Sequence, residues 1–109
     1  MTIEHAVKTG EAHICPISYW EVQHAIGRGR LALAVPIEEW RRRHLAIGYI
    51  ERSITGVDTM LMAQLIDFHA DPADRLIVAV AVNAGLTLLT SDEKILAWPG
   101  QLTRQSTRI

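Results

Sequence analysis

Apolar and polar positions form blocks along this chain, and the clearest block predicts a buried helix ending before Gly85. Asp71 can cap the first turn, Pro72 suits the first helical position because its missing N–H has no helical partner anyway, and Asp74 then falls at the third position. The run from Leu76 to Val82 is apolar on nearly every side, which requires burial on most faces. Gly85 can adopt the left-handed conformation that ends many helices, so the pattern predicts a core helix.

A short strand is expected directly after this helix. Residues 86–89 are almost entirely apolar, as in parallel strands that are covered on both faces. Thr90, Ser91 and Asp92 follow at the carboxyl end of the strand. Open parallel sheets bind ligands at that edge, so Asp92 is a candidate for chemistry.

The front of the chain repeats this order of strand and helix. Residues 12–17 are mostly apolar and predict a strand. Ser18 and Glu21 have the spacing of a capping box, which predicts a helix running toward Ile26. Glu21 is therefore expected just past a strand, as Asp74 and Asp92 are.

The middle of the chain continues the α/β order. Pro36 is expected to begin a helix that has acidic residues in its first turn, arginines at 41–43 and a glycine beyond its end. Residues 49–54 predict a short strand, and Thr55 with Asp58 is expected to cap a further helix. Residues 1–10 have the pattern of a helix end, and the polar residues 101–109 are expected to form a flexible end, with an edge strand as the alternative.

Three carboxylates, those of Glu21, Asp74 and Asp92, are thus predicted at the same kind of place. Each has a simpler alternative role in helix capping or dipole stabilisation, worth about 0.5–1 kcal/mol. If adjacent strands bring them within about 4 Å of each other, they repel by several kcal/mol at an effective dielectric constant of about 20. A bound cation would remove that repulsion, and oxygen ligands without thiols favour Mg²⁺ or Mn²⁺.

The ordered set of motifs resembles the PIN-domain nucleases, within them the ribonuclease toxins of the VapBC toxin–antitoxin type. It comprises ISYWE at 17–21, GRGRLAL at 27–33, HADPADRLIVAVA at 69–81 and LLTSDEKI at 88–95. The resemblance implies a three-layer α/β/α domain with a parallel sheet and RNA cleavage by divalent metal held at Glu21, Asp74 and Asp92. It further implies a cognate antitoxin whose peptide inhibits the site, and a homodimer.

One departure from the family pattern leaves a second function open. The usual N-terminal strand and its acidic residue are absent, so the expected domain is N-terminally truncated and weakly stable alone. Either the start is internal, or a second copy or partner covers the gap, or the chain folds poorly. The alternative function is a catalytically impaired remnant that retains only dimerisation or antitoxin binding. A small phospho-acceptor or nucleotide-binding domain is disfavoured, because no glycine-rich phosphate loop is present.

Composition limits the remaining choices. A chain of 109 residues that is 49% hydrophobic is expected to form one domain, 1–109. It has no apolar run long enough for a membrane span or a signal core, so a cytoplasmic protein is expected. Its single cysteine cannot form an internal disulfide, and its histidines lack zinc-ligand spacing.

RNA contacts are expected to be local, because a net charge of −1 gives no overall attraction for RNA. The candidates for RNA contact are Arg28, Arg30, Arg75 and Thr90. The alternative role of Arg75 is a structural bridge, and Thr90 alternatively serves only to end its strand. Arginines 41–43 fan around a helix and are expected to face solvent. Trp20 and Trp40 are expected to pack in the core or a groove, and Trp98 to be partly exposed.

Overall fold

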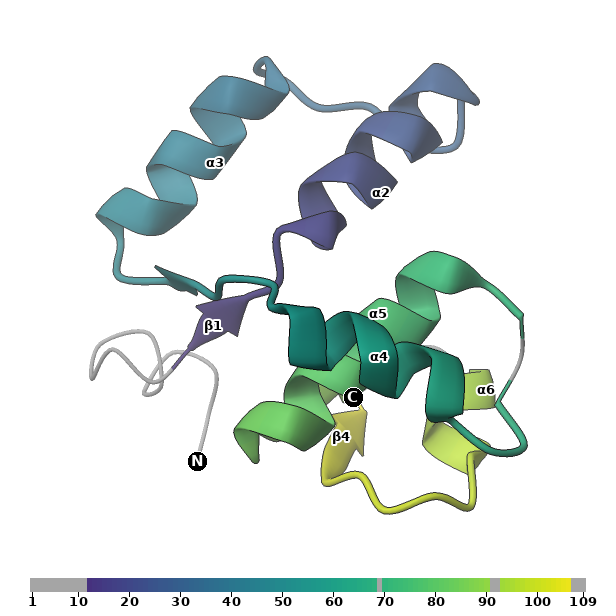
Figure 1. The fold of residues 1–109 in the computed structure, drawn as a ribbon. Coiled ribbons are helices and arrows are strands. Elements are labelled where there is room, and N and C mark those ends of the chain that lie inside the picture. The colour runs from purple at the N-terminus through teal and green to yellow at the C-terminus, as the bar shows by residue number, and fades with distance from the viewer. Residues whose placement is uncertain (1–11, 69, 91–92, 107–109) are drawn as a thin grey trace. The chain divides into compact units, whose positions relative to one another are not determined.

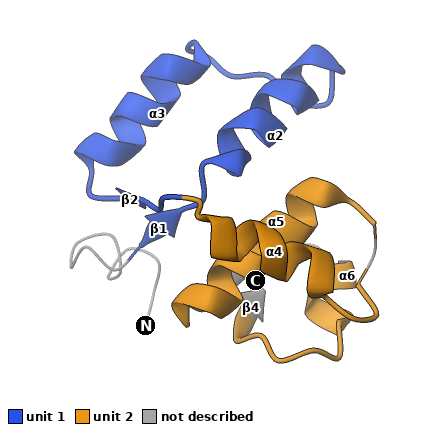
Figure 2. Cartoon of the chain, viewed as in Figure 1, with its two compact units in different colours: residues 1–53 blue, residues 54–109 orange. Residues whose placement is uncertain are grey.

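The computed structural model describes residues 12–68, 70–90 and 93–106, with the side chains of a few residues near the gaps left undescribed. The chain divides into two compact units, residues 1–53 and 54–109 (Figure 2). Each unit contains a pair of parallel strands together with helices. The predicted α/β class with parallel strands is therefore confirmed.

The first unit joins two short strands and two helices. Strands β1 (His13–Ile14) and β2 (Ile50–Glu51) pair in parallel, with His13 opposite Ile50. Between them run α2 (Ile17–Gly27) and α3 (Ile37–Ala46). The strand expected over residues 12–17 is shorter than predicted because the helix already begins at Ile17.

The second unit contains α4 (Gly56–Gln64), α5 (Pro72–Ala84), β3 (Leu88–Thr90), α6 (Glu93–Ala97) and β4 (Arg104–Ser106). Helices α4 and α5 pack side by side, as Figure 1 shows. Strand β4 pairs in parallel with β3, so this part of the polar C-terminal end forms the edge strand rather than the expected flexible end.

Helix α5 confirms the clearest pattern in the sequence. The Asp71 carboxylate accepts hydrogen bonds from the backbone N–H groups of Ala73 and Asp74, and Pro72 is the first helical residue. Gly85 ends the helix with a φ of 67°. Most of the apolar run is buried, and Val78 is completely inaccessible to solvent.

An aromatic pair packs against α5 in the core of the second unit. Phe68 and Trp98 meet edge to face with their ring centroids 5.5 Å apart, and Val78 and Ile95 complete the buried cluster. The Trp98 indole is 8% exposed and donates a hydrogen bond of 2.7 Å to the carbonyl of Ile66. The expectation that Trp98 is partly exposed was wrong, because Pro99-Gly100 turns the chain without drawing the ring out of the core.

Candidate functional site

Asp74 lies at the beginning of α5, at the third helical position as predicted. Its backbone N–H lies 3.2 Å from the Asp71 carboxylate, and its side chain is partly exposed. Asp71 therefore serves as the helix cap and fixes the main chain that carries Asp74. The position near the positive end of the helix dipole favours an ionised carboxylate at Asp74.

Arg75 makes a structural bridge to backbone carbonyls. Its guanidinium donates to the carbonyls of Met62 at 2.9 Å, Leu65 at 3.4 Å and Phe68 at 2.8 Å. Met62 belongs to the last turn of α4 and Leu65 is its C-cap, so Arg75 satisfies carbonyls that have no partner within the helix. These contacts support the structural alternative for Arg75 and hold the first turn of α5 against the preceding loop.

Glu21 lies on the fifth residue of α2, in the second helical turn, and its side chain is partly buried. The predicted capping box between Ser18 and Glu21 was wrong, because Pro16 is the N-cap and no side chain caps the helix. Backbone carbonyls perform this task, since the N–H of Ser18 donates to Cys15 and that of Tyr19 to Pro16. Glu21 therefore lies in the second turn of the helix rather than in the first turn, where the predicted capping box required it.

A cluster of polar side chains joins α2 to α3 and β2, and its member on α2 is Tyr19, two residues before Glu21. The Tyr19 hydroxyl donates to Glu51 at 3.0 Å, and Arg41 of α3 donates to the same carboxylate through Nε at 2.7 Å and Nη2 at 3.1 Å. Hydrogen bonding from Arg41 lowers the pKa of Glu51, whereas burial raises the pKa of Tyr19. The Tyr19 ring also meets Trp40 edge to face, so α2 and α3 are joined by polar and aromatic contacts.

The third candidate acid, Asp92, lies outside the described residues, as does Ser91. Thr90 ends β3 and pairs with Ser106 through its backbone. Glu21 belongs to one compact unit and Asp74 to the other, so the meeting of the three acids stays a prediction. Within the described part of the chain, no three His, Cys, Asp or Glu side chains gather closely enough to hold a metal ion.

Arg28 and Arg30 lie at the end of α2, where the backbone turns sharply. The N–H of Arg30 donates to Ala25 and that of Gly29 to Ile26, and Gly29 has a φ of 72°. This is the hydrogen-bond pattern of a Schellman motif, which places both arginines on an ordered helix end. Both residues are exposed to solvent.

Sequence reasoning placed Trp20 wrongly and found only part of the role of Asp58. Trp20 was expected to pack in the core or a groove, but it is 56% exposed. The spacing of polar residues at 23, 24 and 28 could have shown that it lies on the outer face of its helix. Asp58 was expected only as a cap, yet its side chain is buried and also binds Asn83 of α5.

Comparison with known proteins assigns the family. Residues 2–99 match the PIN domain, a range that spans most of the chain and contains all three candidate acids. The chain therefore belongs to the PIN-domain family.

One curated relative gives a finer comparison. The chain is 32% identical to Ribonuclease VapC22 of Mycobacterium tuberculosis over 96 residues, which cover 85% of this chain and 69% of the relative. No solved structure matches the chain significantly. In the part of the chain that the structure describes, no helix has the length and apolar character needed to cross a bilayer.

Proposed function

We propose that this chain is a metal-dependent endoribonuclease and the toxin component of a type II toxin–antitoxin pair. The observation that carries the proposal is the similarity to Ribonuclease VapC22 over 85% of the chain, within a PIN-domain match that contains Glu21, Asp74 and Asp92. In this proposal the cognate antitoxin is the regulatory partner, RNA is the substrate, and the protein acts in the cytoplasm as a homodimer.

The three acids are the proposed metal ligands and catalytic residues. Their carboxylate oxygens are the donors that Mg²⁺ and Mn²⁺ prefer, so the residue types fit such an ion. A bound divalent ion would supply positive charge to stabilise the phosphate group during its cleavage. Asp71 supports this role indirectly, because its hydrogen bond to the Asp74 backbone orients the turn from which the Asp74 carboxylate projects.

The remaining polar residues have separate proposed tasks. Arg28 and Arg30 are proposed to contact substrate phosphates, and Thr90 to lie beside the site at the carboxyl end of β3. Arg75 was a further candidate for substrate binding. Its three carbonyl contacts favour a role in holding α4 and α5 together.

The test is cleavage of a structured RNA by the purified chain in Mg²⁺, in Mn²⁺ and in chelator. Asp74→Asn is expected to lower the rate at least about 100-fold, because loss of a direct ligand should cost no less than loss of a residue that merely orients one. Asp67→Asn is the matched control: it makes the same chemical change in the same unit at an exposed residue with a φ of 58°, a conformation that asparagine also tolerates.

Three outcomes distinguish the possibilities, with folding checked by circular dichroism. Cleavage that needs metal, survives in the control and disappears in Asp74→Asn supports the proposal. Metal-dependent cleavage that is unchanged in Asp74→Asn would reject the assignment of this acid. A folded protein that is inert in both metals would instead favour a remnant that retains only dimerisation or antitoxin binding.

A further inference from the structure

The outer face of α2 carries an ordered aromatic stack. Exposed residues recur at positions 20, 23, 24, 27 and 28, which is the spacing of a single helix face. The rings of Trp20 and His24 stack with centroids 4.8 Å apart and planes 9° from parallel. Trp20 nevertheless remains 56% exposed, so the stack orders the indole while leaving much of it accessible.

Positive charge lies at the end of this face. Between residues 12 and 53 the sequence has six arginines and four glutamates, a net charge of +2 in a chain whose total is −1. Arg41 binds Glu51, while Arg42 and Arg43 bind Glu39. No ion pair is found for Arg28 or Arg30 among the described residues, and the Schellman motif holds both beyond the last turn.

We infer that Trp20, His24, Arg28 and Arg30, here called the α2 platform, bind single-stranded RNA. Trp20 stacks on a base, and the two arginines bind phosphates. Trp20 and Arg28 are eight residues apart, about 12 Å along the helix axis, which matches roughly three to four stacked nucleotides. The inference rests on the proposed function, because RNA is the ligand that function requires.

The composition of the face favours RNA over a protein surface. Trp20 is the sole exposed large apolar residue of α2, whose residues are all described, and its neighbours on the face are Gln23, His24 and Arg28. A planar ring among polar and cationic groups is typical of single-strand binding, in which bases stack on aromatic rings and the backbone follows positive charge. Glu21 adjoins Trp20 in sequence, so the α2 platform begins beside one of the proposed metal ligands.

Binding can be measured without cleavage by fluorescence anisotropy of a labelled 12-nucleotide oligouridylate in chelator. Trp20→Ala is expected to weaken binding by about 5- to 150-fold, the range found for loss of one stacked base, whereas Trp20→Phe retains most of the affinity. Arg28→Gln is expected to reduce the slope of log affinity against log salt by about 0.7.

Two matched controls test the specificity of these effects. Ile47→Ala truncates another exposed apolar residue of the same unit, and Arg42→Gln removes a charge that is already paired. Both are expected to leave the stacking contribution intact. The inference would be overturned if Trp20→Ala bound the oligouridylate as tightly as the unchanged chain. If that variant also lost its dimer on size-exclusion chromatography, the face would be assigned to protein contact.

The measurement is independent of nuclease activity. An inert chain that binds RNA through Trp20 would support the α2 platform while rejecting the nuclease proposal. An active nuclease whose RNA affinity is unchanged in Trp20→Ala would support the nuclease proposal while rejecting the α2 platform.

Discussion

The buried carboxylate of Asp58 provides the sharpest test of how the second unit is held together. Its side chain is 3% exposed and accepts hydrogen bonds from the Thr55 backbone N–H at 2.8 Å and from Asn83 Nδ2 at 2.9 Å. The Asp58 N–H in turn donates to Thr55 Oγ1 at 3.3 Å, which completes a capping box. One side chain thus begins α4 and joins it to α5.

Asp58→Ala is expected to lower the free energy of unfolding by about 3 kcal/mol. Loss of the cap contributes about 1 kcal/mol, and loss of a hydrogen bond to a buried charged group about 1.5–3 kcal/mol. Asn83→Ala should cost less, about 1 kcal/mol, because Asn83 is itself exposed and water can replace part of the contact. Against a typical stability of about 5–15 kcal/mol, the first variant should be clearly destabilised.

The assay is urea unfolding followed by far-ultraviolet circular dichroism for both single variants and the double variant. A coupling energy of at least about 0.5 kcal/mol between Asp58 and Asn83 is expected, as for residues in direct contact. Thr59→Ala is the control, since its hydroxyl bonds an exposed carbonyl on the same helix, and it should change stability by less than about 0.5 kcal/mol. Additive effects in the double variant would refute the reasoning.

Three further predictions concern packing, capping and pH. Gly100→Ala should destabilise by about 1–3 kcal/mol in thermal unfolding, because its Cβ would overlap the Trp98 ring, whereas Gly56→Ala meets no atom within 4 Å and should be tolerated; equal effects would contradict this. Arg75→Met should cost about 2 kcal/mol by removing the donor to carbonyls at the end of α4 and in the loop before α5, and an unchanged urea midpoint would argue against it. Hydrogen bonds from Arg42 and then Arg43 lower the pKa of Glu39 from 4.5 to about 2, so the stabilisation should be complete above about pH 4.5 and disappear as the pH falls to about 2. Glu39→Gln should lack this pH dependence in a series of melting curves, and an identical profile would rule the ion pairs out as its source.

Local signals in the sequence were sufficient where one short segment determines the structure. Asp71, Pro72 and Gly85 specify both ends of α5, and Thr55 with Asp58 specifies the start of α4, because each cap depends on neighbours within four residues. The predicted capping box at Ser18 was wrong because the helix begins earlier, with Pro16 as its N-cap. The N–H groups of Ser18 and Tyr19 are already paired with the carbonyls of Cys15 and Pro16.

Properties that depend on distant residues could not be obtained in this way. The buried position of Trp98 requires a carbonyl from Ile66, 32 residues earlier, and the partner of Asp58 lies 25 residues later. The exposed Trp20 was misread for a related reason: an aromatic residue suggests burial until the outer face of its helix is known. The position of Asp74 on α5 was within reach of sequence reasoning, whereas Glu21 was assigned to the right helix but to its first turn rather than its second. Whether these acids meet Asp92 remains a prediction.

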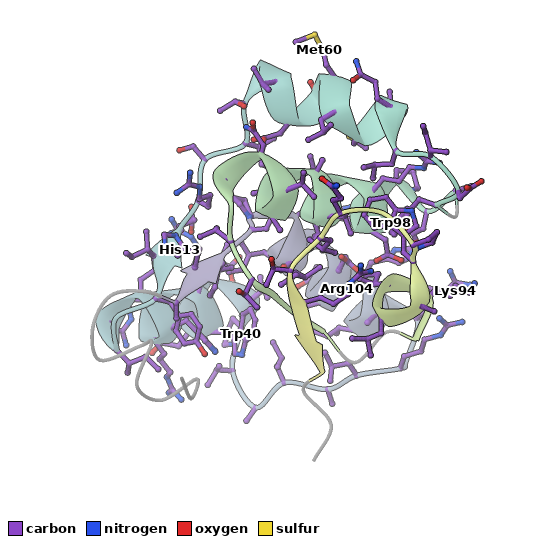
Figure 3. All side chains as sticks on the ribbon, turned by 90° about the horizontal axis from the view of Figure 1, so that it is seen from below. His13, Trp40, Met60, Lys94, Trp98 and Arg104 are labelled. Atoms are coloured by element: carbon purple, nitrogen blue, oxygen red, sulfur yellow. The ribbon has the colours of Figure 1, made fainter. Side chains whose placement is uncertain are left out.

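The side chain of Arg104 constrains how the sequence and length of the segment between α6 and β4 can evolve. Its guanidinium donates to four backbone carbonyls, those of Ile95, Trp98, Gly100 and Leu102 (Figure 3 labels Arg104 and Trp98). Carbonyl groups are common to all amino acids, so sequence drift in this segment, apart from Gly100, leaves their pairing intact. Insertion or deletion of a residue would displace several acceptors at once. Apart from the core residues Trp98 and Leu102 and the closely packed Gly100, this loop should therefore vary in sequence among descendants of the chain while keeping a constant length.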